Sequence, residues 1–157
     1  MPQLDVVRLL LIAAAAFNGV LTGASLDQSI KQLPARRRIG VIAFSTYSRA
    51  ADLGNGIVWY AIIGIGAALL TIGAAVSAYL RMASAAAAIP LYLAALTSLL
   101  HSFTTSQAAP TLFRVRQVKD DAAQLTMIFN RFERWQTLRA ALQVVTFGLT
   151  LWALAAA

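Results

Sequence analysis

Long apolar stretches alternate along this chain with shorter segments that gather the charged residues. Four stretches lack Asp, Glu, Lys and Arg and contain about 18, 28, 32 and 18 residues: 9–26, 53–80, 82–113 and 140–157. A helix needs about 20 mainly apolar residues to cross the hydrocarbon of a bilayer. The alternating strands of a membrane barrel are not visible, which leaves the helix as the spanning structure. The pattern predicts four membrane helices.

Segments of mixed polarity extend two of these helices. Residues 35–52 follow Pro34, a residue favoured in the first turn of a helix, and residues 115–139 place apolar side chains at helical spacing. We therefore expect one all-α domain over residues 1–157, an integral membrane four-helix bundle. Its helices are predicted at about 6–26, 35–80, 84–106 and 115–155, with the second and fourth extended on the cytoplasmic side.

Composition supports a membrane protein. Of the 157 residues, 59% are hydrophobic and 12% are charged, against about 25% charged in soluble domains. The chain has no cysteine, which excludes disulfides, thiolate metal sites and a cysteine nucleophile. The first apolar stretch could also be a signal peptide cleaved near Gly23-Ala24-Ser25, but it runs past the usual length and Asp5 weakens its positive start.

The positive charges fall on one side of the predicted topology. Of the 13 Lys and Arg residues, all but Arg8 and Arg81 lie after the first or third apolar stretch. The positive-inside rule predicts that these connections are cytoplasmic and that both termini lie outside, in a bacterial plasma membrane. The basic face should attract anionic lipid headgroups. Nucleic acid is not an expected partner, because no recognisable binding motif accompanies the charges.

Polar residues within the apolar stretches predict a chamber. Polar groups in hydrocarbon usually face a bundle interior, and antiparallel helices bring those of all four stretches to the cytoplasmic end. The candidate catalytic residues are His101, Asp52 and Arg139. The candidate ligand-binding residues are Asn18, Arg49, Asn55, Trp59, Tyr60, Thr105, Arg131 and Trp135. A structural network is the alternative, for example an ion pair of Asp52 with Arg49 or Arg139.

His101 is the single histidine. It could be a hydrogen-bonded structural residue, or a general acid or base, since imidazole titrates near neutral pH. No metal site is expected, because three protein ligands are not visible at suitable spacing. No bound cofactor is expected either. A haem with His101 as its single axial ligand, or a flavin, remains an alternative. No phosphate-binding glycine loop or nucleophile elbow is present.

Small residues predict close helix packing. The first stretch contains Gly19 and Gly23, and the second contains Gly64, Gly66 and Gly73. Such residues let the backbones of neighbouring helices approach one another closely within lipid. They could serve contacts inside the bundle or a homo-oligomer.

Four short features occur along the chain: Pro34-Ala35-Arg36, Tyr47, Thr104-Thr105 with Pro110, and Trp135-x3-Arg139. Together they resemble motifs of the small four-helix membrane proteins grouped with the anthrone oxygenases, a family mostly of unknown function. Many members have His inside the last motif, where this chain has Thr137.

The resemblance implies oxidation of a flat aromatic molecule by dioxygen without a bound cofactor. A base, His101 or Asp52, would remove a C–H proton, Arg139 would stabilise the anion, and Trp59 and Trp135 would stack on the substrate.

Two functions follow from the sequence. The first is a membrane protein that binds, and in one version oxidises, a small lipophilic or aromatic molecule. The second is a non-catalytic accessory or scaffold subunit of a membrane complex, with a lipid or protein partner.

Overall fold

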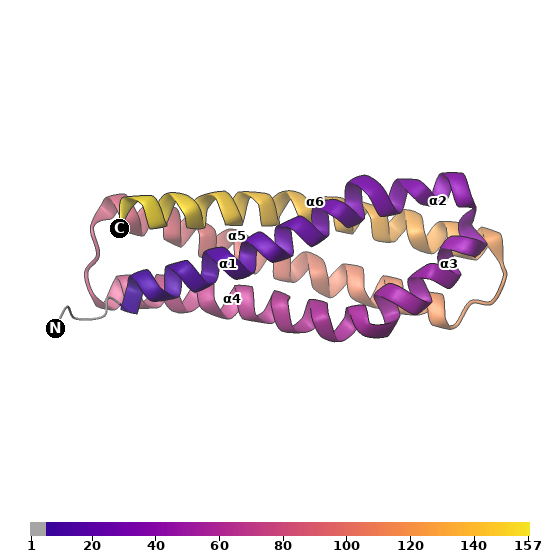
Figure 1. The fold of residues 1–157 in the computed structure, drawn as a ribbon, viewed down its shortest axis with the longest axis horizontal. Coiled ribbons are helices and arrows are strands. Elements are labelled where there is room, and N and C mark those ends of the chain that lie inside the picture. The colour runs from indigo at the N-terminus through magenta and orange to yellow at the C-terminus, as the bar shows by residue number, and fades with distance from the viewer. Residues whose placement is uncertain (1–5) are drawn as a thin grey trace.

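The computed structural model describes residues 6–157, and helices make up nearly all of this range. Four long rods run side by side along the molecule (Figure 1). The first joins α1 (Val6–Leu26), the π-helical turn η1 (Asp27–Gln32) and α2 (Leu33–Ile39). The second joins α3 (Val41–Ala50), the π-helical turn η2 (Ala51–Asn55) and α4 (Gly56–Leu80). The third is α5 (Ala85–Phe113) with the 3-10 turn η3 (Arg114–Arg116), and the fourth is α6 (Ala122–Ala156).

Each rod is long and apolar enough to cross a membrane. The four candidate spans are Val6–Ile39, Val41–Leu80, Ala85–Arg116 and Ala122–Ala156. Large apolar side chains lie on the outside of the bundle, among them Ile62 and Leu69 on α4, which are 61% and 66% exposed. An outer surface of this kind suits lipid. The predicted all-α four-helix membrane bundle is confirmed.

The break between the first two rods differs from the prediction. We expected a helix to begin after Pro34, but the first rod continues to Ile39 and the second begins at Val41. Pro34 is tolerated at the start of α2 because it follows the wider turn of η1, where the ordinary hydrogen-bond ladder is already interrupted. The corner is at Gly40, whose φ of 85° and ψ of 154° favour glycine.

The third and fourth helices also differ at their ends. The third was expected to end near 106, yet α5 continues to Phe113 with Pro110 inside it. The fourth begins at Ala122 rather than near 115, because the Asp121 side chain accepts hydrogen bonds from the backbone N–H groups of Ala123 and Gln124. The third rod is therefore longer at this end than the pattern predicts.

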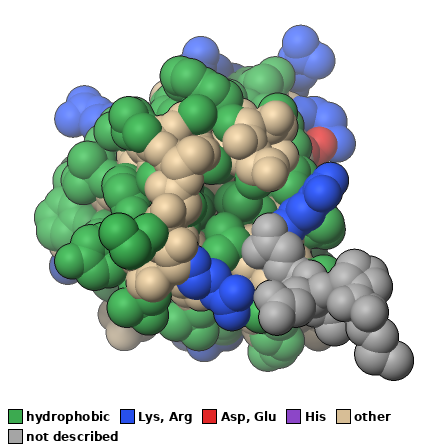
Figure 2. Space-filling view, turned by 90° about the vertical axis from the view of Figure 1, so that its left-hand side faces the viewer, with side chains coloured by type: hydrophobic (Ala, Val, Ile, Leu, Met, Phe, Trp, Pro, Cys, Tyr) green, Lys and Arg blue, Asp and Glu red, His purple; other side chains and the backbone are tan. Residues whose placement is uncertain are grey.

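The two ends of the bundle differ in charge. One end, here called the basic end, holds the Gly40 corner and the 117–121 connection; the other, the terminal end, holds the 81–84 turn and the C-terminus (Figure 1). Figure 2 looks onto the terminal end and shows many hydrophobic side chains on this face, with Lys and Arg side chains mostly around its rim. The segments that contain eleven of the 13 Lys and Arg residues lie toward the basic end.

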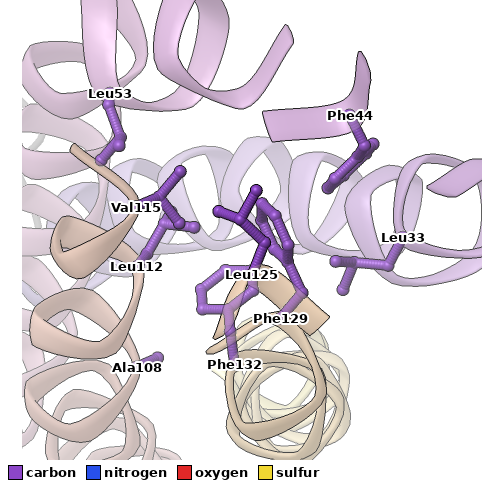
Figure 3. Close-up of a cluster of buried hydrophobic side chains, with 9 residues drawn as sticks. All are labelled: Leu33, Phe44, Leu53, Ala108, Leu112, Val115, Leu125, Phe129 and Phe132. Carbon is purple, nitrogen blue, oxygen red and sulfur yellow. The ribbon is translucent and has the colours of Figure 1, made fainter. Parts of the chain in front are cut away.

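Two separate hydrophobic clusters hold the bundle. The cluster at the basic end brings together residues of all four rods (Figure 3): Leu33, Phe44, Leu53, Ala108, Leu112, Val115, Leu125, Phe129 and Phe132. Within it, the Phe44 and Phe129 rings pack edge to face at 5.0 Å. The cluster at the terminal end contains Leu11, Ala74, Ala75, Ala78, Leu91 and Ala153. Buried polar residues of all four rods lie between these clusters, among them Asn18, Thr71, His101, Arg139 and Gln143.

Polar contacts also fasten the basic end. Arg36 on α2 donates hydrogen bonds from Nη2 to Asn130 Oδ1 and Glu133 Oε2 on α6, both at 2.9 Å. Its guanidinium also lies over the Phe129 ring, 5.6 Å from the centroid. These contacts hold α2 against α6.

Two glycines permit close packing within the bundle. A Cβ added at Gly66 would lie 2.6 Å from Phe17 Cε1, and one added at Gly19 would lie 3.1 Å from Phe147 Cε2. At these two positions the glycine lets a Phe ring of a neighbouring rod pack against the helix. Gly23, Gly64 and Gly73 have open space where a Cβ would be.

Candidate functional site

A cavity of about 690 Å³ lies between the two hydrophobic clusters and is lined by all four rods. Its volume is in the range of small-molecule sites, about 300–1,000 Å³. Its polar lining residues are Gln28, Asp52, Tyr60, His101, Ser102, Thr105, Ser106, Arg139 and Gln143. The rest of the lining is apolar or glycine and includes Leu21, Gly64, Ile65, Ala68, Leu69, Pro110, Phe113 and Phe132.

The three candidate catalytic residues line this one cavity. Asp52 comes from η2, His101 from α5 and Arg139 from α6. They are far apart in sequence and meet because neighbouring rods run in opposite directions. The candidate ligand-binding residues Tyr60 and Thr105 line the cavity as well.

A glutamine stands between the charged residues of the cavity. Gln28 Nε2 donates to Asp52 Oδ1 at 3.2 Å, and Arg139 Nη2 makes a long hydrogen bond of 3.5 Å to Gln28 Oε1. Ser48 Oγ donates to the other Asp52 oxygen, Oδ2, at 2.8 Å. Asp52 and Arg139 are thus joined through an amide, without an ion pair between them.

The expected ion-pair alternative is corrected by this geometry. The ion pairs found within residues 6–157 are Lys31 with Asp27, and Arg36 and Arg37 with Glu133. Arg49, the other proposed partner of Asp52, instead donates to the backbone carbonyls of Val115 and Val118. Arg49 therefore joins α3 to the end of the third rod and lies outside the cavity lining.

Both π-helical turns deliver a residue to the cavity. Gln28 lies in η1 and Asp52 lies in η2. A π-helical turn holds an extra residue and changes the direction of side chains, and such turns are frequent at functional sites. At η2, Gly54 has the non-helical ψ of −118°, and a Cβ at Gly56 would lie 2.7 Å from the Ala51 carbonyl oxygen. The local sequence Gly54-Asn55-Gly56 therefore permits the turn that positions Asp52.

Arg139 is buried with incomplete hydrogen bonding. Its residue exposure is 9%, and its Nε has no hydrogen-bond partner within the part of the chain that the structure describes. Its guanidinium carbon lies 5.9 Å from the Tyr60 ring centroid, within the range of a cation–π contact. A guanidinium has five N–H donors, and a buried charge is costly unless it is well paired. Arg139 can therefore donate a hydrogen bond to a further acceptor.

His101 is nearly fully buried, with 2% exposure. Its Nε2 lies 3.4 Å from Ser98 Oγ, and its backbone carbonyl accepts hydrogen bonds from the Thr104 and Thr105 hydroxyls at 2.7 and 2.9 Å. None of the hydrogen bonds or ion pairs found within residues 6–157 joins its ring to a carboxylate. The ring can exchange a proton with a molecule in the cavity, but it is not part of a carboxylate-oriented triad.

Other candidate ligand-binding residues lie elsewhere. Asn18 is buried, and its Nδ2 donates to Thr71 Oγ1 at 2.9 Å, which joins α1 to α4. Asn55 is exposed. Arg131 is exposed on α6 and lines a separate groove with Arg114, near the 117–121 connection. These three residues are outside the cavity lining.

The predicted tryptophan walls are also outside the cavity. Trp59 is 42% exposed and packs edge to face on Tyr60 at 5.0 Å, while Trp135 packs against the cluster at the basic end. The aromatic lining comes instead from Tyr60, Phe113 and Phe132. Thr137, which lies between Trp135 and Arg139, is exposed and donates to the Glu133 carbonyl.

Gln28 and Gln143 were not among the candidate residues, although both line the cavity. Gln143 follows Arg139 by one helical turn on α6, so spacing alone could have identified it. Gln28 follows the first apolar stretch, and its position depends on η1, which the sequence pattern does not reveal.

The cavity's polar residues lie near one edge of the expected hydrocarbon layer. A helix rises 1.5 Å per residue, so His101, Arg139 and Tyr60 lie about 24, 26 and 30 Å from the ends of their helices at the terminal end. The hydrocarbon layer is about 30 Å thick. If the layer begins at the terminal end, this polar group lies just inside its opposite face.

The site shows no metal-binding cluster: within residues 6–157, no three His, Cys, Asp or Glu side chains come together to hold an ion. Comparisons of the chain with protein-family models, curated proteins and solved structures find no match.

Proposed function

We propose that this protein binds a small lipophilic or aromatic molecule in the cavity between its four rods. The observation that carries the proposal is the division of the lining. Asp52, Gln28, His101 and Arg139 provide polar groups, while α4 provides an apolar wall toward the terminal end. A ligand with a polar group and an apolar body suits both parts of such a site.

The proposal includes an orientation in the membrane. We infer that the basic end faces the cytoplasm and that the C-terminus lies outside, in a plasma membrane, because cytoplasmic connections are enriched in Lys and Arg. The cavity's polar group would then lie near the cytoplasmic interface. The basic residues beyond it would contact anionic headgroups.

Filling the cavity tests the proposed binding. Gly64→Leu places a side chain where the structure has open space at the cavity wall, and Gly73→Leu is a matched control on the same helix, also in open space but outside the lining. The purified proteins in nanodiscs are irradiated with a neutral lipophilic diazirine probe, and labelled peptides are mapped by mass spectrometry. We expect labelling of the cavity-lining parts of α4 and α5 in wild type and Gly73→Leu, and a severalfold loss in Gly64→Leu.

Equal labelling of all three proteins would contradict binding in the cavity. That outcome would favour the non-catalytic accessory or scaffold function, in which the outer surface of the bundle meets a partner.

Oxidation of the bound molecule is a further part of the proposal, suggested by the resemblance to anthrone oxygenase-like proteins. His101 would take a proton from an acidic C–H group, and the Arg139 guanidinium would stabilise the resulting enolate. The carbanion carbon would bond to dioxygen, and the resulting peroxide would take the proton back from His101. Loss of water from this hydroperoxide would leave a quinone carbonyl, so that dioxygen is the four-electron oxidant and one of its oxygen atoms leaves as water. Support comes from the presence of both side chains in one cavity with three aromatic residues.

Oxygen consumption with anthrone tests this chemistry. We expect wild-type nanodiscs to consume dioxygen faster than empty nanodiscs. In His101→Gln this excess rate should be at least tenfold lower, because general-base catalysis contributes on the order of 10²-fold or more. A wild-type rate equal to that of empty nanodiscs would reject oxidation of anthrone and leave the binding proposal in place.

A further inference from the structure

We propose that the ligand of this cavity is a carboxylate-bearing amphiphile that enters sideways from the bilayer between α4 and α5, with its carboxylate on Arg139. This inference rests on the proposed binding function and names the chemical class of the ligand and its route; it is an alternative to the oxidation of anthrone, which would use the same Arg139 guanidinium for an enolate.

The exposure of the lining residues locates the opening. Ile65 and Leu69 on α4 are 61% and 66% exposed, and Phe113 on α5 is 43% exposed. The lining residues from the other two rods are buried: Leu21, Gln28 and Arg139 are 3%, 3% and 9% exposed. The cavity therefore has its mouth between α4 and α5 and its inner wall on α1 and α6.

The mouth reaches from the hydrocarbon layer to the interface at the basic end, because Phe113 lies about 42 Å from Ala85 by the helical rise, beyond a layer of about 30 Å. Ile65 and Leu69 lie about 22 and 16 Å from the end of α4 at Leu80, by the helical rise. These depths are well inside a hydrocarbon layer of about 30 Å that begins at the terminal end. An amphiphile already dissolved in the bilayer can reach the cavity without crossing water.

Small residues form one strip of the apolar wall. Ala61, Gly64 and Ala68 line the cavity and follow one another at helical spacing on one face of α4. A Cβ at Gly64 would meet no atom within 4 Å. This strip leaves room for an apolar chain or ring to lie along α4.

Arg139 selects the polar group of the ligand. It is buried, its hydrogen bond to Gln28 is long, and its Nε has no partner in the described chain. A carboxylate matches the planar, forked donors of a guanidinium and supplies the missing negative charge. The ligand would complete the pairing of this buried cation.

The other titratable groups around the cavity are compatible with a carboxylate at Arg139. Asp52 is the negatively charged group in the lining, and both of its oxygens already accept hydrogen bonds, from Gln28 and Ser48. Gln28 separates it from Arg139. Tyr60 and His101, which also line the cavity, carry hydrogen-bond donors.

A matched pair of probes tests the inference. Nitroxide-labelled stearic acid and its methyl ester are added to the protein in nanodiscs, at a pH where the acid is ionised, and the motionally restricted spin fraction is measured. Wild type is expected to bind the acid at least tenfold more tightly than the ester. Arg139→Gln is expected to reduce this preference to less than twofold while it still binds the ester.

The acid-to-ester ratio is measured within each protein, so partial unfolding of a variant does not change it. Gly64→Leu is expected to remove the restricted fraction of both probes relative to Gly73→Leu. Equal binding of acid and ester by wild type, or an unchanged ratio in Arg139→Gln, would overturn the carboxylate inference. Unchanged binding of both probes in Gly64→Leu would instead overturn the cavity as the binding site.

Discussion

At the scale of single residues, Gln28 determines how charge is arranged in the cavity. Its amide donates to Asp52 and accepts from Arg139, so the two charged side chains share a site without direct contact. Direct pairing would consume the donors of Arg139. The amide leaves both a cation and an anion next to the space that a ligand would occupy.

Removal of the negative charge should strengthen binding of an anionic amphiphile. Asp52→Asn keeps the shape of the side chain and removes a repulsion on the order of 1 kcal/mol, so we expect the affinity for the spin-labelled acid to rise about fivefold. The ester should bind as before. Ser48→Ala is the control, because it deletes a hydrogen bond to Asp52 and retains the charge. A weaker affinity of Asp52→Asn for the acid would contradict the assignment of Arg139 as the carboxylate partner.

At the scale of elements, the sequence predicts the spans better than their ends. A stretch of about 20 residues without charge can be recognised without knowing which other helices pack against it. All four spans were predicted from this signal. The end of the first rod was misplaced because Pro34 usually starts a helix, whereas here it follows a π-helical turn. The conformation of Gly40 depends on the packing of α2 and α3, which local pattern does not specify.

The same elements explain which site residues could be predicted. Asp52, Asn55 and Trp59 lie on one face of a regular helix drawn through this segment. The extra residue of η2 breaks that regularity, and Asp52 lines the cavity while Asn55 and Trp59 do not. His101 and Arg139 lie in uninterrupted α-helices, α5 and α6, where helical spacing remains a sound guide.

The corner at Gly40 should be sensitive to a single methyl group. A non-glycine residue at φ 85° and ψ 154° is strained by about 1–3 kcal/mol, so Gly40→Ala should lower the free energy of unfolding by about that amount. Gly148→Ala, on exposed helical backbone with open space, should be neutral or stabilising by up to about 1 kcal/mol. Denaturant titration in mixed micelles compares the two variants. An equal change in both would show that the backbone conformation of Gly40 carries no special cost.

At the scale of the whole molecule, the bundle is divided along its length. Hydrophobic clusters close the terminal end and the basic end, and the polar cavity lies between them. Contacts of Arg36 with Asn130 and Glu133 hold the basic end together beyond the expected membrane layer. Stability can therefore reside in the ends, while the middle retains an open volume.

The proposed orientation can be measured directly because the chain has no cysteine. Ser84→Cys places an exposed thiol in the turn at the terminal end, and Asp120→Cys places one in the connection at the basic end. In intact cells, a membrane-impermeant maleimide should label the thiol of Ser84→Cys. The thiol of Asp120→Cys should be labelled only after the membrane is disrupted. The reverse labelling would place the basic end outside and contradict the positive-inside assignment.

The paired π-helical turns also make the cavity sensitive to chain length. Loss of one residue from η1 would let the segment close into a regular α-helix, because a π-helical turn holds one residue more than an α-helical turn. The helices on either side would keep their places and Arg36 would still reach Glu133, while side chains inside the turn, including Gln28, would change direction. A related chain shortened by one residue here could retain four membrane helices and similar composition, yet lack the amide that separates Asp52 from Arg139. Alignment gaps at residues 27–32 and 51–55 would therefore distinguish chains with this cavity from chains that share only the bundle.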